Sequence, residues 1–475
     1  MNKLKKIISQ LNKEQFKEFE ESLKGTNSVK FSSLLQNYKE GTLSDEEIKE
    51  ELKCTDNSYY VLKSRLYDKI QRFLLDHNTS VVQIGNESNV SNLSTYLYEH
   101  PVETAIAMLK ELENKYINSD SPGELINVYS ALKKANFYSD KYYHYSQLYN
   151  NQVAYALALE KAEETLCNFN RTLASYYFSA APQDADLLQL LIKEIKNLYS
   201  LYKSPRIEII YNIILIQSEL FAKIEIEEAP PVEDLLKRSE NIINLFTKDN
   251  RTGLYKPVIN FLNFEYYFGL NQLKKASTYY KEIDVLFERW LLQNNLCLSF
   301  KFLLSKIDFL IAMNRKEEIG DSEKSVFYDG NDLHTHVIYK FYNGVSSYFS
   351  GKVKNSITLL NDLLNEVSFK NYFTVETEIK LTLAYLYILQ DDIEMADNTL
   401  KGLSRKVASL GNDGLKNVKE AIKLMYLISD GLDKKNSLAK YKDTLEQLNY
   451  YNFKGRKILS FLQHELESLA LTKRR

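Results

Sequence analysis

Two histidines and their acidic neighbours come closest to a metal site in this sequence. His334 and His336 follow Asp329, Asn331 and Asp332, and these side chains carry the nitrogen and oxygen atoms that bind metal ions. Two histidines two positions apart do not share a helix face, and the run lacks the glycine and the closing glutamate of a calcium loop. We therefore interpret this segment as a solvated loop.

The other residues that could do chemistry form no catalytic motif. The six histidines include no HExxH arrangement, and the sequence has no P-loop, no dinucleotide-binding glycine pattern and no nucleophile elbow. Cys54, Cys167 and Cys297 are isolated from one another, which is typical of a reduced cytoplasm. We expect a cytoplasmic protein that is not an enzyme and that uses no cofactor or metal.

A basic stripe is the one indication of nucleic-acid binding. Arg65, Lys69 and Arg72 recur at helical spacing on an expected helix over residues 59–76, where a recognition helix would carry phosphate contacts. Residues 1–76 hold fourteen Lys and Arg against thirteen Asp and Glu, far from the basic footprint of a DNA-binding domain. A solvated helix face is the interpretation that we favour.

The elements that position these residues are expected to be helices. Gly and Pro number only 15 and 7 among 475 residues, and no proline follows Pro257, so helix-breaking residues are scarce. Charged residues make up 26% of the chain with a net charge of −2, which favours protein partners over nucleic acid or anionic lipid. No run of about eighteen apolar residues indicates a membrane span.

The sequence divides into a module and a longer array. Residues 1–76 predict a compact helical module that resembles a helix-turn-helix, with Ser44 and Glu47 as a capping box. Residues 77–94 are rich in Asn and Ser and predict a connector. Residues 95–475 predict the array, with a candidate hinge at 225–231 and a C-terminal cap at about 412–475. Its last helix carries many charges, as expected of a solvent-facing cap.

One stretch shows the repeating unit most clearly. Residues 341–364 predict two helices joined by a tight turn, with Gly344 and Ser356 as small residues that let the helices approach closely. Such a pair cannot bury its apolar stripe alone and must stack on neighbouring pairs. Gly351 is expected to end the first helix with a left-handed cap, and the equivalent turn residues are Asn271, Asn314, Gly351 and Asp391. Their steps of 43, 37 and 40 residues predict one repeated unit.

These helix pairs resemble tetratricopeptide repeats. The best match is the copy with Leu383, Ala384, Tyr387 and Ala396. The pair at 341–364 keeps Gly344 at the small position but has Asn343 and Ser347 where Leu and Tyr are usual, and no copy has the closing proline. The resemblance covers residues 92–115 and 257–405.

The resemblance implies an all-α fold, a right-handed α-solenoid whose first helices line a concave groove for a peptide or partner helix. Carried over by position, the groove residues are Phe261, Glu265, Phe268, Phe341, Val345, Tyr348, Phe349, Leu381, Tyr385, Ile388 and Leu389. Tyr348 and Tyr385 are expected to project from the concave side as partner contacts. The alternative for each apolar member is ordinary core.

Three functions from different classes remain. The first, which we favour, is a non-enzymatic interaction scaffold or adaptor that binds a peptide or partner helix in the groove. The second is a peptide- or protein-responsive transcriptional regulator in which residues 1–76 bind DNA. The third is an enzyme or nuclease subunit with its site in the tyrosine-rich region after Pro122. The sequence does not indicate the identity of the partner.

Overall fold

The computed structural model shows an all-α protein. It describes residues 4, 7, 8, 11, 13–23, 28–41, 43–82, 93, 97, 102–224, 226, 229–245, 254–287, 296–319, 332–410, 415–431, 435–454 and 458–472. Within these ranges there is no strand. The chain forms two compact units, Met1–Ala158 and Leu159–Arg475, and the boundary falls within the long helix α9 (Lys141–Ser179).

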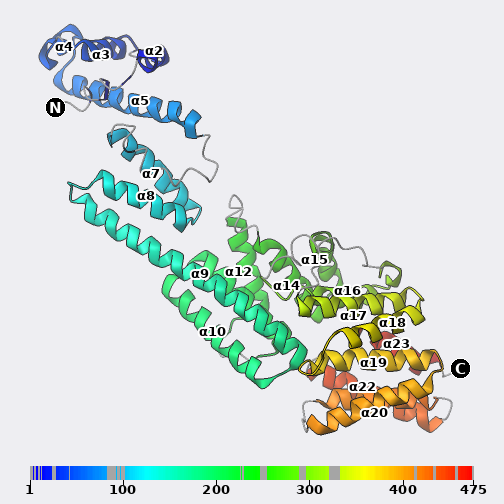
Figure 1. The fold of residues 1–475 in the computed structure, drawn as a ribbon. Coiled ribbons are helices and arrows are strands. Elements are labelled where there is room, and N and C mark those ends of the chain that lie inside the picture. The colour runs from blue at the N-terminus through cyan, green and yellow to red at the C-terminus, as the bar shows by residue number, and fades with distance from the viewer. Residues whose placement is uncertain are drawn as a thin grey trace. The chain divides into compact units, whose positions relative to one another are not determined.

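The first unit begins with the predicted helical module. Its helices are α2 (Lys13–Ser22), α3 (Ser28–Glu40), α4 (Asp45–Glu51) and α5 (Asp56–Val82) (Figure 1). The predicted capping box is confirmed, because the Glu47 amide donates to the Ser44 hydroxyl and the Ser44 amide donates to the Glu47 carboxylate. Helix α5 continues six residues past the predicted end of the module, into the predicted connector.

A first helix pair follows in the same unit. It consists of α7 (Val102–Asn118) and α8 (Pro122–Ala135), which contact each other, and α5 contacts α7. Pro122 stands in the first turn of its helix, as Pro182 and Pro205 do in two later helices, where a missing amide hydrogen is tolerated. The predicted connector lies largely outside the described residues, as do Glu225, Glu227 and Glu228 of the predicted hinge.

The second unit stacks helices in chain order. Its elements are α10 (Pro182–Tyr202), α11 (Pro205–Gln217), the π-helical turn η2 (Ser218–Ala222), α12 (Val232–Leu245), α14 (Tyr255–Gly269), α15 (Leu273–Leu286), α16 (Lys301–Ala312), the 3₁₀ turn η4 (Lys316–Glu318), α17 (Leu333–Phe349), α18 (Val353–Glu366), α19 (Phe373–Leu389), α20 (Ile393–Leu410), α21 (Lys416–Ser429), α22 (Lys435–Lys454), the 3₁₀ turn η6 (Ser460–Leu462) and α23 (Gln463–Thr472). From α17 to α22 each helix contacts the next, the arrangement of an α-solenoid (Figure 1).

The four predicted turns share one backbone geometry. Asn271, Asn314, Gly351 and Asp391 all have positive φ angles, between 55° and 78°. In each turn the amide of the next residue donates to the carbonyl five positions back, for example Lys352 to Ser347 and Asp392 to Tyr387, which is the helix-ending bond of a Schellman motif. The structure therefore confirms that these positions are equivalent.

The predicted close approach of α17 and α18 is also confirmed. The Ser356 hydroxyl donates to the Gly344 carbonyl over 2.6 Å, and the Leu360 side chain lies against the space where a side chain at Gly344 would be. Both small residues are buried. Because both residues are small, the α17 backbone at Gly344 lies directly against the Ser356 and Leu360 side chains of α18.

Helix α19 is buried on nearly every face. Every residue from Thr374 to Tyr387 is buried except Glu378 and Lys380, which are half-buried. A helix that is buried around its whole circumference has neighbours on every side. Helices α18, α20 and α21 all contact α19.

Candidate functional site

The face formed by α16, α17 and α19, which we call the inner face, carries a segment from the C-terminal end of the chain. This segment, residues 458–472, contains η6 and α23 and follows α22. The turn η6 contacts α16, and the Phe461 ring packs edge-on against Phe341 of α17 with 5.8 Å between centroids. Phe461, Leu462 and Leu466 are buried there. The segment thus adds, through Leu459 and Glu378, to the cover that α18, α20 and α21 give to α19.

Charged and polar groups fix the segment along the edge of the inner face. Glu465 of α23 accepts from the Lys316 ammonium over 2.6 Å, and the Tyr348 hydroxyl donates to the same carboxylate over 3.4 Å. The Leu459 amide donates to both carboxylate oxygens of Glu378 on α19, at 2.9 and 3.0 Å. These bonds set both the position and the direction of the segment.

A third helix holds the other side of the segment. The buried Tyr441 hydroxyl of α22 donates to the Leu466 carbonyl over 2.7 Å. Asn452, also on α22, pairs with both backbone groups of Ile458, since its side-chain amide donates to the Ile458 carbonyl and its oxygen accepts from the Ile458 amide. Helix α22 therefore anchors the beginning of the segment.

The two tyrosines that face the segment remain neutral at ordinary pH. Burial raises the pKa of Tyr348, and the neighbouring Tyr385 and Glu465 add to that rise. Burial also raises the pKa of Tyr385. The two rings meet edge-on at 6.1 Å. A protonated Tyr348 hydroxyl is a hydrogen-bond donor, as recognition of a carboxylate requires.

The structure places the predicted groove residues of α17 and α19 on or next to this inner face, but not in an open groove. Phe341, Val345, Leu381 and Tyr385 are buried, and Tyr385 is only 2% exposed. Tyr348, Phe349 and Ile388 are half-buried, and Leu389 is 43% exposed. The expectation that Tyr385 projects into solvent is corrected, because the chain's own C-terminal segment and the neighbouring helices cover it. The last helix buries Leu466 and leaves Gln463 and His464 exposed.

The predicted groove residues of α14 belong to the core between helices. Phe261 packs against Phe302 of α16, and Phe268 packs against Phe309 of the same helix, with centroids 6.2 and 5.7 Å apart. Glu265 is buried and pairs with Lys301 over 2.6 Å. Phe261 and Glu265 are buried and therefore not available as groove contacts in this structure, whereas Phe268 is half-buried.

The basic stripe lies where the sequence predicts it. Arg65, Lys69 and Arg72 are exposed on α5, while Leu62, Leu66 and Ile70 of the same helix are buried. The Lys69 ammonium lies over the Phe31 ring at 5.7 Å from its centroid. The stripe is therefore a surface feature of the first unit, and DNA binding stays a hypothesis.

The histidines at the start of α17 have structural neighbours. The His334 ring lies edge-on to Phe178 and Tyr372, at 4.8 and 5.8 Å between centroids, and His336 faces the Glu366 carboxylate at 3.5 Å. Asp329 and Asn331 lie outside the described residues. In the part of the chain that the structure describes, no group of three or more His, Cys, Asp or Glu side chains is arranged to hold a metal ion.

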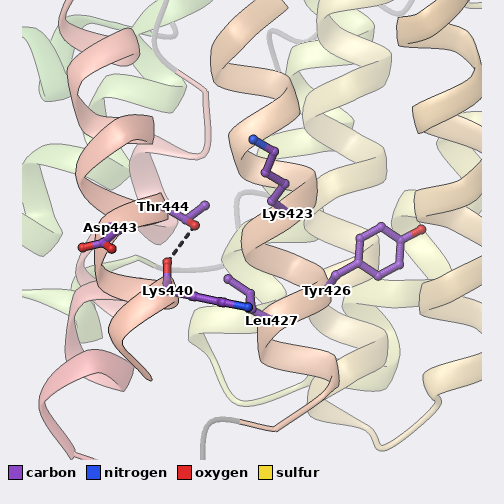
Figure 2. A pocket seen from close by; sticks show the side chains of 6 residues that line it. All are labelled: Lys423, Tyr426, Leu427, Lys440, Asp443 and Thr444. Atoms are coloured by element: carbon purple, nitrogen blue, oxygen red, sulfur yellow. Dashed lines mark hydrogen bonds between the residues drawn. The ribbon is translucent and has the colours of Figure 1, made fainter. Parts of the chain in front are cut away.

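A surface hollow of about 400 Å³ lies between α21 and α22 (Figure 2). Its lining residues are Lys423, Tyr426, Leu427, Lys440, Asp443 and Thr444. The Thr444 hydroxyl donates to the Lys440 carbonyl of its own helix, and Lys423 pairs with Glu420 one turn earlier. The Thr444 hydroxyl and the Lys423 ammonium thus bond within their own helices.

Sequence reasoning missed the residues of the C-terminal segment itself. Phe461 and Phe341 are 120 positions apart, and Glu465 and Lys316 are 149 apart, so no local pattern connects them. The sequence of α19, FTVETEIKLTLAYLYIL, has apolar residues on all faces and so predicts that other parts of the chain pack against every side of this helix. It does not identify the covering segment.

Comparison with known proteins adds no family. No protein-family model, no curated protein and no solved structure matches this chain. No described helix combines the length and the apolar character needed to span a bilayer.

Proposed function

We propose that this chain is a non-enzymatic interaction protein that binds a helical segment of a partner on its inner face. One observation carries the proposal: the inner face already holds a helical segment, residues 458–472, by an aromatic contact, a carboxylate contact and backbone hydrogen bonds. Those are the contacts by which grooves recognise amphipathic helices. We further propose that the helix pairs are tetratricopeptide-like, in keeping with their shared turn geometry.

The chemistry of the inner face supports recognition. Phe341 and Tyr385 provide an aromatic floor, and Tyr348 and Lys316 provide a donor and a positive charge at its edge. Aromatic residues dominate the binding energy of protein interfaces because they bury a large area at a small entropic cost. The edge groups then select a segment with a suitably placed carboxylate.

A site-specific crosslinking experiment tests this proposal. A photoreactive phenylalanine analogue is placed at Phe349, a half-buried aromatic whose ring lies 5.9 Å from the Lys316 ammonium. The matched control carries the analogue at Tyr426, a half-buried aromatic in the hollow between α21 and α22. We expect Phe349 crosslinks in cells to map to one short helical segment of a second protein. Equal capture of the same peptides at both positions would contradict the proposal.

A regulator that binds DNA is the second candidate, favoured by the exposure of Arg65, Lys69 and Arg72 on one side of α5. In that function the first unit would contact phosphates, and the inner face would sense a peptide or protein. The near-neutral charge balance of residues 1–76 weakens it, because phosphate binding draws on many released counterions.

A further inference from the structure

The C-terminal segment is held by side-chain contacts and by hydrogen bonds to its backbone. It follows α22, so leaving the inner face breaks none of the helices from α14 to α22. Its helix α23 has ten residues, and an isolated helix of that length is marginal in water. The segment is therefore helical because it is docked.

The backbone at the start of the segment is strained while it is docked. Leu459 has φ 52° and ψ 28°, in the left-handed region that residues with a Cβ atom rarely occupy, and its side chain is buried. The Glu378 carboxylate that accepts from the Leu459 amide holds it in that conformation. Release of the segment would relieve this strain, which lowers the barrier to exchange.

Release without replacement is unfavourable. It would expose the Phe341 ring and the aromatic side chains of Tyr385 and Tyr441, all of which are buried in the structure. The Lys316 ammonium would also lose the Glu465 carboxylate. The segment can therefore leave only in exchange for a segment that restores the same contacts.

The docked residues specify what such a replacement must carry. Phe461 and Glu465 are four positions apart, as are Leu462 and Leu466, so all four lie on one side of the helical turn. Phe461 meets Phe341, and Glu465 meets Lys316 and Tyr348. An aromatic–leucine pair followed by a carboxylate–leucine pair one turn later is thus the pattern that the inner face recognises.

We propose that residues 458–468 are an internal ligand that closes the inner face, and that the partner is an amphipathic helix with this same aromatic, leucine and carboxylate pattern, which binds by displacing it. This inference rests on the proposed function and adds that the chain's own segment regulates partner binding by competing for the inner face. The internal segment competes at an effective concentration of roughly millimolar, as expected for a short tether. Partners of modest affinity are therefore excluded, and weakening the internal contacts opens the site.

A peptide-exchange experiment on the full chain tests the inference. The probe is a fluorescent peptide of residues 458–472, ILSFLQHELESLALT, and binding is measured by anisotropy. The Glu465→Lys chain loses its own ion pair with Lys316 while the inner face keeps its residues, so we expect it to bind the probe about tenfold more tightly than the wild-type chain. The matched control is Glu467→Lys, which makes the same charge change at a residue whose carboxylate accepts from Gln463 of its own helix and interacts with Tyr441 of α22, away from Lys316 and Tyr348.

A charge exchange keeps the test decisive if Glu465→Lys loosens the fold. The Lys316→Glu chain should prefer a probe carrying Glu465→Lys over the unmodified probe, because the ion pair is then restored in reverse. Equal affinity of the Glu465→Lys and Glu467→Lys chains for the probe would overturn the inference. So would probe-independent dimers of the Glu465→Lys chain in light scattering, since the occupant would then be the segment of a second copy.

The crosslinking experiment at Phe349 separates this inference from the proposed function. If the internal segment closes the face, the Glu465→Lys chain captures more of the partner segment than the wild-type chain. Equal capture by both chains would leave the proposed function standing and overturn the internal ligand. Capture by neither chain would overturn both.

Discussion

Gly344 has no room for a side chain. A Cβ atom at this position would lie 2.5 Å from Leu360 Cδ2 and 2.8 Å from Leu360 Cγ, so the fully buried Leu360 side chain would have to shift. We expect Gly344→Ala to lower the free energy of unfolding by about 1–3 kcal/mol in urea denaturation, because it overpacks the core. Gly402→Ala is the matched control. Gly402 is exposed in α20 with no neighbour within 4 Å, so this change should stabilise by about 0.5–1 kcal/mol. Two equal effects would contradict the close approach.

Tyr385 is a core residue beneath the C-terminal segment. Tyr385→Ala should destabilise by about 3–5 kcal/mol because it leaves a cavity beside Tyr348. Leu389→Ala, on the same helix but at an exposed position, should change stability by no more than about 0.5 kcal/mol. Thermal and urea unfolding of both variants provide the measurement. A mild effect at Tyr385 would restore the expectation of an open groove there.

The turns between paired helices each need a residue with a positive φ angle. Gly351 has a φ of 78°, and Asp391 holds the equivalent position with a φ of 61°. A residue with a Cβ atom is disfavoured in this region, so Gly351→Ala should destabilise by about 1–2 kcal/mol and Asp391→Gly should stabilise. Urea denaturation of the two variants gives the comparison. If both changes destabilise equally, the two turns are not equivalent.

Local features of these elements could be predicted from the sequence, and long-range features could not. Gly344, Gly351 and the Ser44 capping box act on residues close in sequence, so spacing alone identified them. The groove positions on α14, α17 and α19 were carried over from the resemblance to tetratricopeptide repeats. The cover over the α17 and α19 positions could not be predicted, because it depends on a pairing of Phe461 with Phe341 that no local pattern encodes. On α14, Phe261 and Glu265 are buried against α16, a neighbour that position within a repeat does not identify.

The basic stripe on helix α5 is not expected to bind duplex DNA at physiological salt. The stripe of Arg65, Lys69 and Arg72 is exposed, but the charges of residues 1–76 nearly cancel. We expect no gel shift of duplex DNA at about 150 mM salt, because few counterions are released on binding. A shift that persists at that salt concentration and is abolished by Arg65→Glu with Lys69→Glu would instead favour the regulator.

At the scale of the whole molecule, buried tyrosines set the response to alkaline pH. Burial raises the pKa of Tyr129 in the first unit and of Tyr279 in the second to about 12, with the nearby Glu113 and Glu240 adding to the respective rises. The folded state thus holds these protons more tightly than the unfolded state, in which the pKa is about 10. Their contribution to stability is complete below pH 10 and is lost as the pH rises through 12.

We therefore expect the free energy of unfolding to fall steadily above pH 10. Tyr279→Phe should reduce the slope of that fall, and Tyr138→Phe, at a residue 98% exposed, should leave it unchanged. Urea denaturation across pH 9–12 gives the slopes. A slope that is the same in both variants would show that burial at Tyr279 does not govern this response.

Residues 458–472 lie on the inner face, where Glu465 meets Lys316. Hydrogen exchange of the α23 amides in a charge-exchange cycle tests it most directly. Lys316→Glu and Glu465→Lys should each accelerate exchange in α23 by about tenfold, and the double variant should return it close to the wild-type rate, since the pair is restored in reverse. Exchange in α23 that is fast in the wild-type chain and indifferent to all three variants would contradict the account.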